Sequence, residues 1–414
     1  MLHQEPISFQ ITYILLALCM LTIPFSSFIF LPVGVVLWGI SLVSFFKKEN
    51  KTILKNRENG IFFAFFLLFF LLNFIGIFYS QNKTLAFAKI ESYLWFFITP
   101  PLFLSLDSQK MTRKRVEILL YGFLISMALV MLVNYGISCK IFIETECSYH
   151  LFYTYLSHFM HPSYQALYAC IALLFSFYFI LKRKHTVLFL CFSIFLLLYI
   201  FMLQSKAGIF TSILFLIFAG LYWINRKKVK YFFSIIFVII LLVVPVTLIK
   251  SIDIKTNRVS YFMNLFKTNR EKDVRILIWQ NAWEVAVENL PFGAGTGDVH
   301  TELNKTYEAN GFPAFQEKNY NAHNQYLETL VGIGILGLLS LLSLFFLAFM
   351  YGIKNRDILL PVFAGIVLFF FLFESMLERK AGGDFIALFM GLLFYNSSLK
   401  DREHSCSKNV YFFQ

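Results

Sequence analysis

The chain has 414 residues, of which 58% are hydrophobic and 19% aromatic. Soluble globular domains are about 45–50% apolar, so this composition excludes an ordinary soluble enzyme and predicts a polytopic membrane protein. The net charge of +12 does not indicate nucleic-acid binding, because the basic residues gather in short loops between apolar segments, where they report topology and contact with anionic lipid.

About twelve apolar segments are long enough to cross a hydrocarbon core of about 30 Å. They are residues 9–26, 28–46, 61–79, 90–106, 117–137, 163–181, 186–204, 208–225, 231–249, 325–351, 358–376 and 383–398. No small-residue cleavage site follows the first segment, which is therefore expected to be an uncleaved span. The predicted fold is an all-α polytopic membrane protein with about 12 transmembrane helices and one large loop containing short helices.

Lys and Arg gather in alternate loops, at residues 47–57, 110–115, 182–184, 226–230, 354–356 and 400–408. Because positive residues stay in the cytoplasm, this pattern predicts that both termini are cytoplasmic and that the other loops face outward. The long loop, residues 251–324, falls on the outer side and divides the chain into a transmembrane bundle at 1–250, the loop itself, and a C-terminal part at 325–414.

The six cysteines are scattered, and no CxxC or Cys/His spacing predicts a metal site. Cys139 and Cys147 share an outer loop. Two interpretations stay open for them: a disulfide in an oxidising compartment, or two free thiols.

Within the long loop, Asp273 is a candidate cap for a helix from about Val274 to Glu288, which Pro291 ends. Four apolar residues fall on one predicted face of this helix, namely Ile276, Trp279, Trp283 and Ala286. Such a face suits either the lipid headgroups or the transmembrane bundle. The following GAGTGD, residues 293–298, lacks the preceding strand and the following Lys-Ser/Thr of a nucleotide loop, so it is expected to be a tight turn against another part of the chain.

His323 lies where the long loop re-enters the membrane. As neutral imidazole it is suited to take a proton from a sugar hydroxyl. Asn324 is expected to orient its ring and to be one of the substrate-binding residues, and Gly332, Gly334 and Gly337 are expected to let the following helix pack closely. Arg275 stands near the start of the predicted loop helix, where backbone N–H groups also attract anions.

Other outer-face residues each have two interpretations. Lys206, in a short turn between two spans, either binds phosphate or extends toward the interface, and His161 is either a binding residue or an ordinary residue at the end of a span. Ionisable residues at 374–380 either mark a site or form a surface cluster. Lys89 and Glu91 are interpreted as an interfacial pair.

The arrangement of these residues resembles the O-antigen ligase and polymerase family of bacterial inner-membrane glycosyltransferases. The resemblance extends over the whole chain in topology. In motifs it covers mainly Arg275 to Gly337, with Arg275-x3-Trp279, the Gly-rich turn, and His323-Asn324-x-Tyr326-Leu327, together with the Ser205-Lys206 turn.

The resemblance implies a GT-C-like fold with a periplasmic active site. The donor would be a glycan on undecaprenyl pyrophosphate, the acceptor lipid A-core or another hydroxyl, and no metal or other cofactor would be needed. His323 would activate the acceptor and Arg275 would hold the pyrophosphate. The family usually has Arg where this chain has Lys206. Lys206 either keeps the phosphate-binding role or passes it to Arg258 or Arg379.

Three functions remain to be separated. A ligase would move a finished glycan to lipid A-core or to a protein hydroxyl, and a polymerase would extend the glycan on its carrier. The single late loop that carries both Arg275 and His323 favours the ligase. A transporter would require charged or broken helices near the bilayer midplane, and few such charges are present.

Overall fold

The computed structural model describes residues 7–25, 27–46, 57–107, 110–225 and 274–411, and these residues form helices joined by loops. In chain order the elements are α1 (Ile7–Thr22), α2 (Ser27–Phe46), α3 (Arg57–Tyr79), α4 (Lys83–Ser105), α5 (Arg113–Thr145), η2 (Ser148–Leu151), α6 (Tyr153–Leu156), α7 (Pro162–Leu181), α8 (Thr186–Met202), α9 (Lys206–Asn225), α12 (Val274–Glu288), α13 (Val299–Ala309), α14 (Pro313–Glu317), α15 (Gln325–Lys354), α16 (Leu359–Phe371), η4 (Met376–Glu378) and α17 (Lys380–Tyr411).

The helical character predicted from the apolar segments is confirmed. Every predicted span except 231–249 overlaps a helix, and 231–249 lies outside the described residues. By length and composition, 4 of the described helices can cross a membrane, namely α3, α5, α7 and α15. Shorter apolar helices accompany them, among them α1, α8 and α16. The total of twelve spans stays a prediction.

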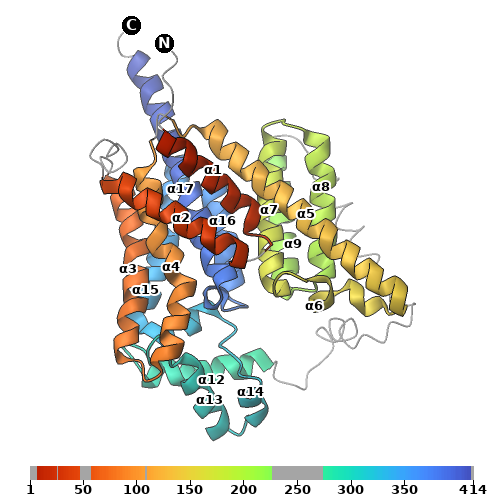
Figure 1. Cartoon of the computed structure of the whole chain (residues 1–414), viewed down its shortest axis with the longest axis vertical. Helices are drawn as coiled ribbons and strands as arrows, with labels where there is room; N and C mark the ends of the chain where they lie inside the picture. The colour runs from red at the N-terminus through yellow and green to blue at the C-terminus, as the bar shows by residue number, and fades with distance from the viewer. Residues whose placement is uncertain (1–6, 26, 47–56, 108–109, 226–273, 412–414) are drawn as a thin grey trace. The chain divides into compact units, whose positions relative to one another are not determined.

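The chain divides into two compact units, the first made of Met1–Phe123 with Arg275–Gln414 and the second of Leu124–Val274. In the first unit, α4 packs against α2, α3 and α17, and α15 packs against α3 and α16 (Figure 1). Glycine allows the closest of these contacts, because a Cβ on Gly383 of α17 would collide with the Ser92 carbonyl of α4. The predicted division at residues 250 and 324 stays a prediction.

The second unit contains most of α5 and the packed helices α7, α8 and α9. Cys139 and Cys147 both carry free thiols. Between α7 and α8, His185 has a left-handed backbone conformation (φ 44°) and directly precedes α8.

The two ends of the first unit differ in charge. At one end the start of α3 meets the end of α15 through an ion pair of Glu58 with Lys354, and Lys400 of α17 donates to the Arg356 carbonyl. Helices α12, α13 and α14 lie at the opposite end (Figure 1). The basic residues at 354–356 and 400 thus lie at the end of the first unit opposite α12–α14 (Figure 1), and the side of the membrane that each end faces stays a prediction.

The glycine-rich turn closes against a break in α15, which confirms the predicted close approach. Ile333 (φ −127°, ψ 17°) and Gly334 (φ 66°) interrupt the helix, so nearby carbonyls lose their helical partners. Ala294 N donates to Val331 O (2.8 Å) and Gly295 N donates to Gly332 O (2.9 Å). A Cβ on Gly334 would collide with the Pro291 carbonyl, so this position requires glycine.

The same turn is tied to the hairpin between α3 and α4. Asp298 accepts hydrogen bonds from the backbone N–H groups of Gln81 (2.5 Å) and Asn82 (2.8 Å). Thr296 Oγ1 donates to the Asn73 carbonyl (2.7 Å). The turn therefore joins the α3–α4 hairpin to α15 and fixes where α12 ends and α13 begins.

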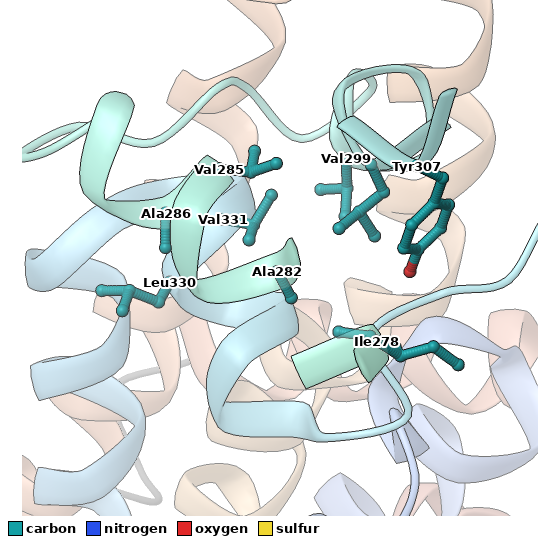
Figure 2. Close-up of a cluster of buried hydrophobic side chains, with 10 residues drawn as sticks. Ile278, Ala282, Val285, Ala286, Val299, Tyr307, Leu330 and Val331 are labelled. Atoms are coloured by element: carbon teal, nitrogen blue, oxygen red, sulfur yellow. The ribbon is translucent and has the colours of Figure 1, made fainter. Parts of the chain in front are cut away.

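Helices α12 and α13 share a small apolar core with the first turns of α15 (Figure 2). Its buried members are Ile278, Ala282, Val285, Ala286, Val299, Leu303, Tyr307, Ala322, Leu330 and Val331. The bounds predicted for α12 are confirmed. The predicted apolar face is only partly buried: Ala286 and Trp279 pack inward, whereas Ile276 and Trp283 are 45% and 57% exposed, because the buried face is centred on Ile278, Ala282 and Val285 and includes only one edge of the predicted face.

We expect the exposed side of α12 to contact lipid. Trp283 is joined there by Val287 and, after the helix, by Phe292, which is 66% exposed. The Phe292 carbonyl accepts a hydrogen bond from Tyr79 at the end of the apolar helix α3. This apolar strip is thus continuous with a candidate membrane span, and tryptophan favours the headgroup region.

Brominated lipids in reconstituted protein test this expectation. Trp283→Phe is expected to lower the fraction of tryptophan emission that the lipids quench. Trp95→Phe is the matched control, because Trp95 is fully buried in α4. Equal quenching in wild type and Trp283→Phe would show that this side of α12 does not meet lipid.

Candidate active site

The Glu374 carboxylate joins the two residues that the sequence placed at the centre of the site. Its Oε1 lies 3.3 Å from an Arg275 guanidinium nitrogen, and its Oε2 lies 3.2 Å from His323 Nδ1. The three side chains are only 14–26% exposed. The fold thus brings Arg275 and His323 to opposite oxygens of one carboxylate.

Three separate elements position these side chains. Arg275 is in the first turn of α12, which the apolar core holds on α15. Glu374 follows α16, and its N–H still donates to the Phe370 carbonyl (3.0 Å). His323 precedes α15 in a left-handed conformation (φ 44°), which is uncommon for a residue with a side chain.

Asn324 has a different local role from the one expected. Its Oδ1 accepts from Tyr326 N (2.9 Å) and Leu327 N (3.2 Å), so it is the N-cap of α15. The expectation that Asn324 orients the His323 ring is wrong: the ring partner is Glu374, since the Asn324 side chain is used in the cap and in a bond to the Leu372 carbonyl. Its assignment to substrate binding stays a prediction.

A second, deeper cluster of charges lies beside the first. Lys89 of α4 places its Nζ 2.9 Å from Glu378 Oε1 and 3.7 Å from Glu328 Oε1. His300 Nε2 lies 2.6 Å from the same Glu378 oxygen. The interpretation of Lys89 and Glu91 as an interfacial pair is wrong: Lys89 turns toward this cluster, and Glu91 pairs with Lys380.

The spacing of this cluster also suits metal ligands, because atoms of His300, Glu328 and Glu378 lie within 4.8 Å of one another. The Lys89 ammonium lies against both carboxylates and supplies positive charge there. Buried carboxylates are stable when they are paired in this way. The arrangement is therefore charge-compensated by the protein's own side chains.

The contact between His300 and Glu378 shifts the pKa of both groups. Burial alone lowers the pKa of His300, but the hydrogen bond to Glu378 and the charges of Glu328 and Glu378 raise it more, and the net pKa is above the ordinary value of 6.5. Burial alone raises the pKa of Glu378, but the hydrogen bond from His300 and the charge of Lys89 lower it further, so its net pKa is below the usual range. The favoured state is a protonated His300 on an ionised Glu378.

We expect His300 to make stability depend on pH. A histidine whose pKa is higher in the folded than in the unfolded protein stabilises the fold fully below its unfolded pKa, and this contribution is lost as pH rises through the folded pKa. The Tm difference between wild type and His300→Gln should be largest below the unfolded pKa of about 6.5 and should shrink as pH rises above it. His185→Gln, outside this cluster, serves as the control, and a difference that grows with pH would contradict the assignment.

The remaining predicted binding residues are placed as follows. Arg379 is exposed and directly follows Glu378. In the second unit, Lys206 is the first residue of α9, and His161 caps α7 by accepting a bond from Ser163 N at Nδ1 (3.4 Å). Arg258 lies outside the described residues. The substrate-binding roles of these four residues stay predictions.

Sequence reasoning marked the ionisable residues at 374–380 but did not select Glu374 as a site residue, and it missed Lys89. The signal for Glu374 was a carboxylate at the end of an apolar segment, which is costly unless it is paired. Only the fold supplies its partners, which are 51 and 99 residues away in the chain.

The described residues are helical, 4 of their helices are long and apolar enough to cross a membrane, and a partly buried site of alternating charges lies at one end of the first unit. Residues 191–342 match the family model described as O-antigen ligase. The predicted resemblance is thereby confirmed for this segment. No curated protein matches the chain. The matched segment includes Arg275 and His323 but ends before Glu374.

Proposed function

We propose that the protein is a glycosyltransferase that moves a glycan from undecaprenyl pyrophosphate to a hydroxyl of lipid A-core at the periplasmic face of the bacterial inner membrane. The observation that carries the proposal is the pairing of Arg275 and His323, both inside the segment that matches the family, on Glu374, which lies beyond the end of that segment. Orientation rests on the basic loops, which would be cytoplasmic and would leave the α12–α14 end outside.

The chemistry assigns a separate task to each side chain. A neutral His323 that donates Nδ1–H to Glu374 would carry its lone pair on Nε2, which is the form of a general base. It would take the proton of the acceptor hydroxyl as the oxygen attacks the anomeric carbon. The bond from that carbon to the pyrophosphate oxygen breaks, and the pyrophosphate leaves on its lipid with an added negative charge.

Arg275 would stabilise this leaving group. A guanidinium has five N–H donors in a planar arrangement that matches phosphate oxygens, and one terminal nitrogen of Arg275 lies 3.3 Å from Glu374. Charge that grows on the leaving oxygens makes this interaction stronger in the transition state than in the ground state. The apolar helices explain how a polar reaction is held beside a lipid carrier.

Glycolipid gels of a deletion strain test the function. Loss of the polymer ladder from lipid A-core, with build-up of lipid-linked polymer, would support the ligase. A core with a single repeat unit would indicate a polymerase, which is the alternative within the family. An unchanged ladder in the deletion strain, together with loss of a glycan that wild type carries on a protein, would indicate a protein O-glycan ligase. An envelope with no change in any glycan would contradict the proposal.

Glu374→Gln is expected to lower the transfer rate on the order of 10²-fold, with little change in acceptor KM. A glutamine keeps the size of the side chain but loses the charge that orients His323 and stabilises its protonated form. Transfer by purified protein in lipid nanodiscs measures the effect. Glu91→Gln is the matched control, since Glu91 pairs with Lys380 outside the site. A wild-type rate in Glu374→Gln would remove Glu374 from the mechanism.

A further inference from the structure

Asn321 links the deep charge cluster to the backbone of His323. Its Nδ2 donates to Glu378 Oε2, and its Oδ1 accepts from His323 N (2.9 Å). The orientation of the amide follows from chemistry, because an ionised carboxylate can only accept and a backbone N–H can only donate. Asn321 therefore transmits the position of Glu378 directly to His323.

Glu378 is itself held on its other oxygen. Oε1 contacts Lys89 of α4 (2.9 Å) and His300 of α13 (2.6 Å). These two cations keep the carboxylate ionised and fix it relative to two helices. Between Asn321 and His323, the buried Ala322 also donates its N–H to Glu328 Oε2 (3.0 Å). Asn321 and Ala322 thus each bond to a carboxylate of the deep cluster, and Asn321 in turn bonds the backbone of His323.

His323 needs this support because its backbone is strained. A left-handed φ of 44° costs a residue with a side chain about 1 kcal/mol or more, and it persists only where surrounding bonds enforce it. The bond from His323 N to the Asn321 side chain, two residues earlier, is an Asx turn that enforces such a bend. Without it, the imidazole would leave Glu374.

We infer that Asn321 and Glu378 are positioning residues for the reaction, which set the backbone of His323 so that its ring meets Glu374. The inference rests on the proposed role of His323 as the general base. It also assigns a role to Lys89 and His300, since these two side chains hold the Glu378 carboxylate to which Asn321 bonds. Nothing in the cluster needs to touch the donor or the acceptor.

The inference is tested by variants that exchange the donor and the acceptor of the hydrogen bond between Asn321 and Glu378. Asn321→Asp places two carboxylates against each other, and Glu378→Gln removes the charge that Lys89 and His300 bind. Each single variant is expected to lower kcat about 10–100-fold with an unchanged KM for the donor. The double variant Asn321→Asp/Glu378→Gln reverses this hydrogen bond: the glutamine at 378 donates and the aspartate at 321 accepts, and the total charge of the two residues is the same as in wild type. This pair should recover at least about tenfold over either single variant.

A second readout follows the imidazole without relying on transfer. Diethyl pyrocarbonate modifies unprotonated histidine, and peptide mass spectrometry gives the rate at each site. The single variants should change the rate at His323, the paired variant should restore it, and the rate at His185 should stay constant. Site-resolved rates at His323 that are equal in all four proteins would overturn the inference, as would a paired variant no better than the singles in kcat.

The two readouts separate this inference from the function itself. If a variant lacking the His323 imidazole keeps full transfer, the proposed base is wrong, and the modification rates still show whether Asn321 and Glu378 set the loop. If transfer depends on His323 but neither single variant lowers kcat, the positioning role is wrong and the base is retained.

Discussion

His323→Asn is expected to lower the rate of glycan transfer about 10²–10⁴-fold, which is the contribution of a positioned general base. Asparagine is the sharpest substitution because it tolerates a left-handed backbone, so the φ of 44° at this position is preserved while the imidazole is lost. Binding of the lipid-linked donor should change little, since Arg275 and not His323 is assigned to the pyrophosphate.

The chain contains a matched control for this substitution. His185 has the same φ of 44° and precedes α8 in the second unit. His185→Asn removes an imidazole from an equivalent backbone conformation and should leave the rate of transfer unchanged. Single-turnover transfer in nanodiscs measures both variants. A rate for His323→Asn within a few-fold of wild type would eliminate the imidazole as the base.

Arg275→Ala is expected to lower kcat about 10²–10³-fold, the usual loss when a charge-stabilising donor is removed from a transition state. Arg275→Lys should retain part of the activity, because an ammonium keeps the charge but lacks the planar arrangement of donors. The measurement is release of undecaprenyl pyrophosphate under saturating donor, with KM determined in parallel. Because Arg275 lies 3.3 Å from Glu374, the loss of kcat in Arg275→Ala is expected to arise at this site.

The control for the arginine variants is Lys305→Ala, which removes a cation from the exposed side of α13, where it pairs with Glu302. It should have the wild-type kcat and KM. If Arg275→Ala raised KM for the donor and left kcat unchanged, Arg275 would bind the ground state and transition state equally. The leaving-group role would then be excluded.

Much of the site's location was predictable from sequence, for a local physical reason. The bounds of α12 follow from periodicity and from a proline after it, and the turn at 293–298 follows from glycines, all of which act over a few residues. Apolar length alone placed α3 and α15. The order of Arg275, the glycine turn and His323 then indicated the family, and the match to residues 191–342 confirms it.

Only the tertiary structure decided which charges meet. Glu374 contacts residues 51 and 99 positions away in the chain. Lys89 pairs with Glu378 and not with its near neighbour Glu91, which pairs with Lys380. The buried side of α12 was likewise decided by its contact with α13 and α15, since both sides of that helix carry apolar residues. Patterns in a sequence report local periodicity, whereas the pairing of distant charges depends on how helices pack and on the high cost of leaving a charge alone away from water.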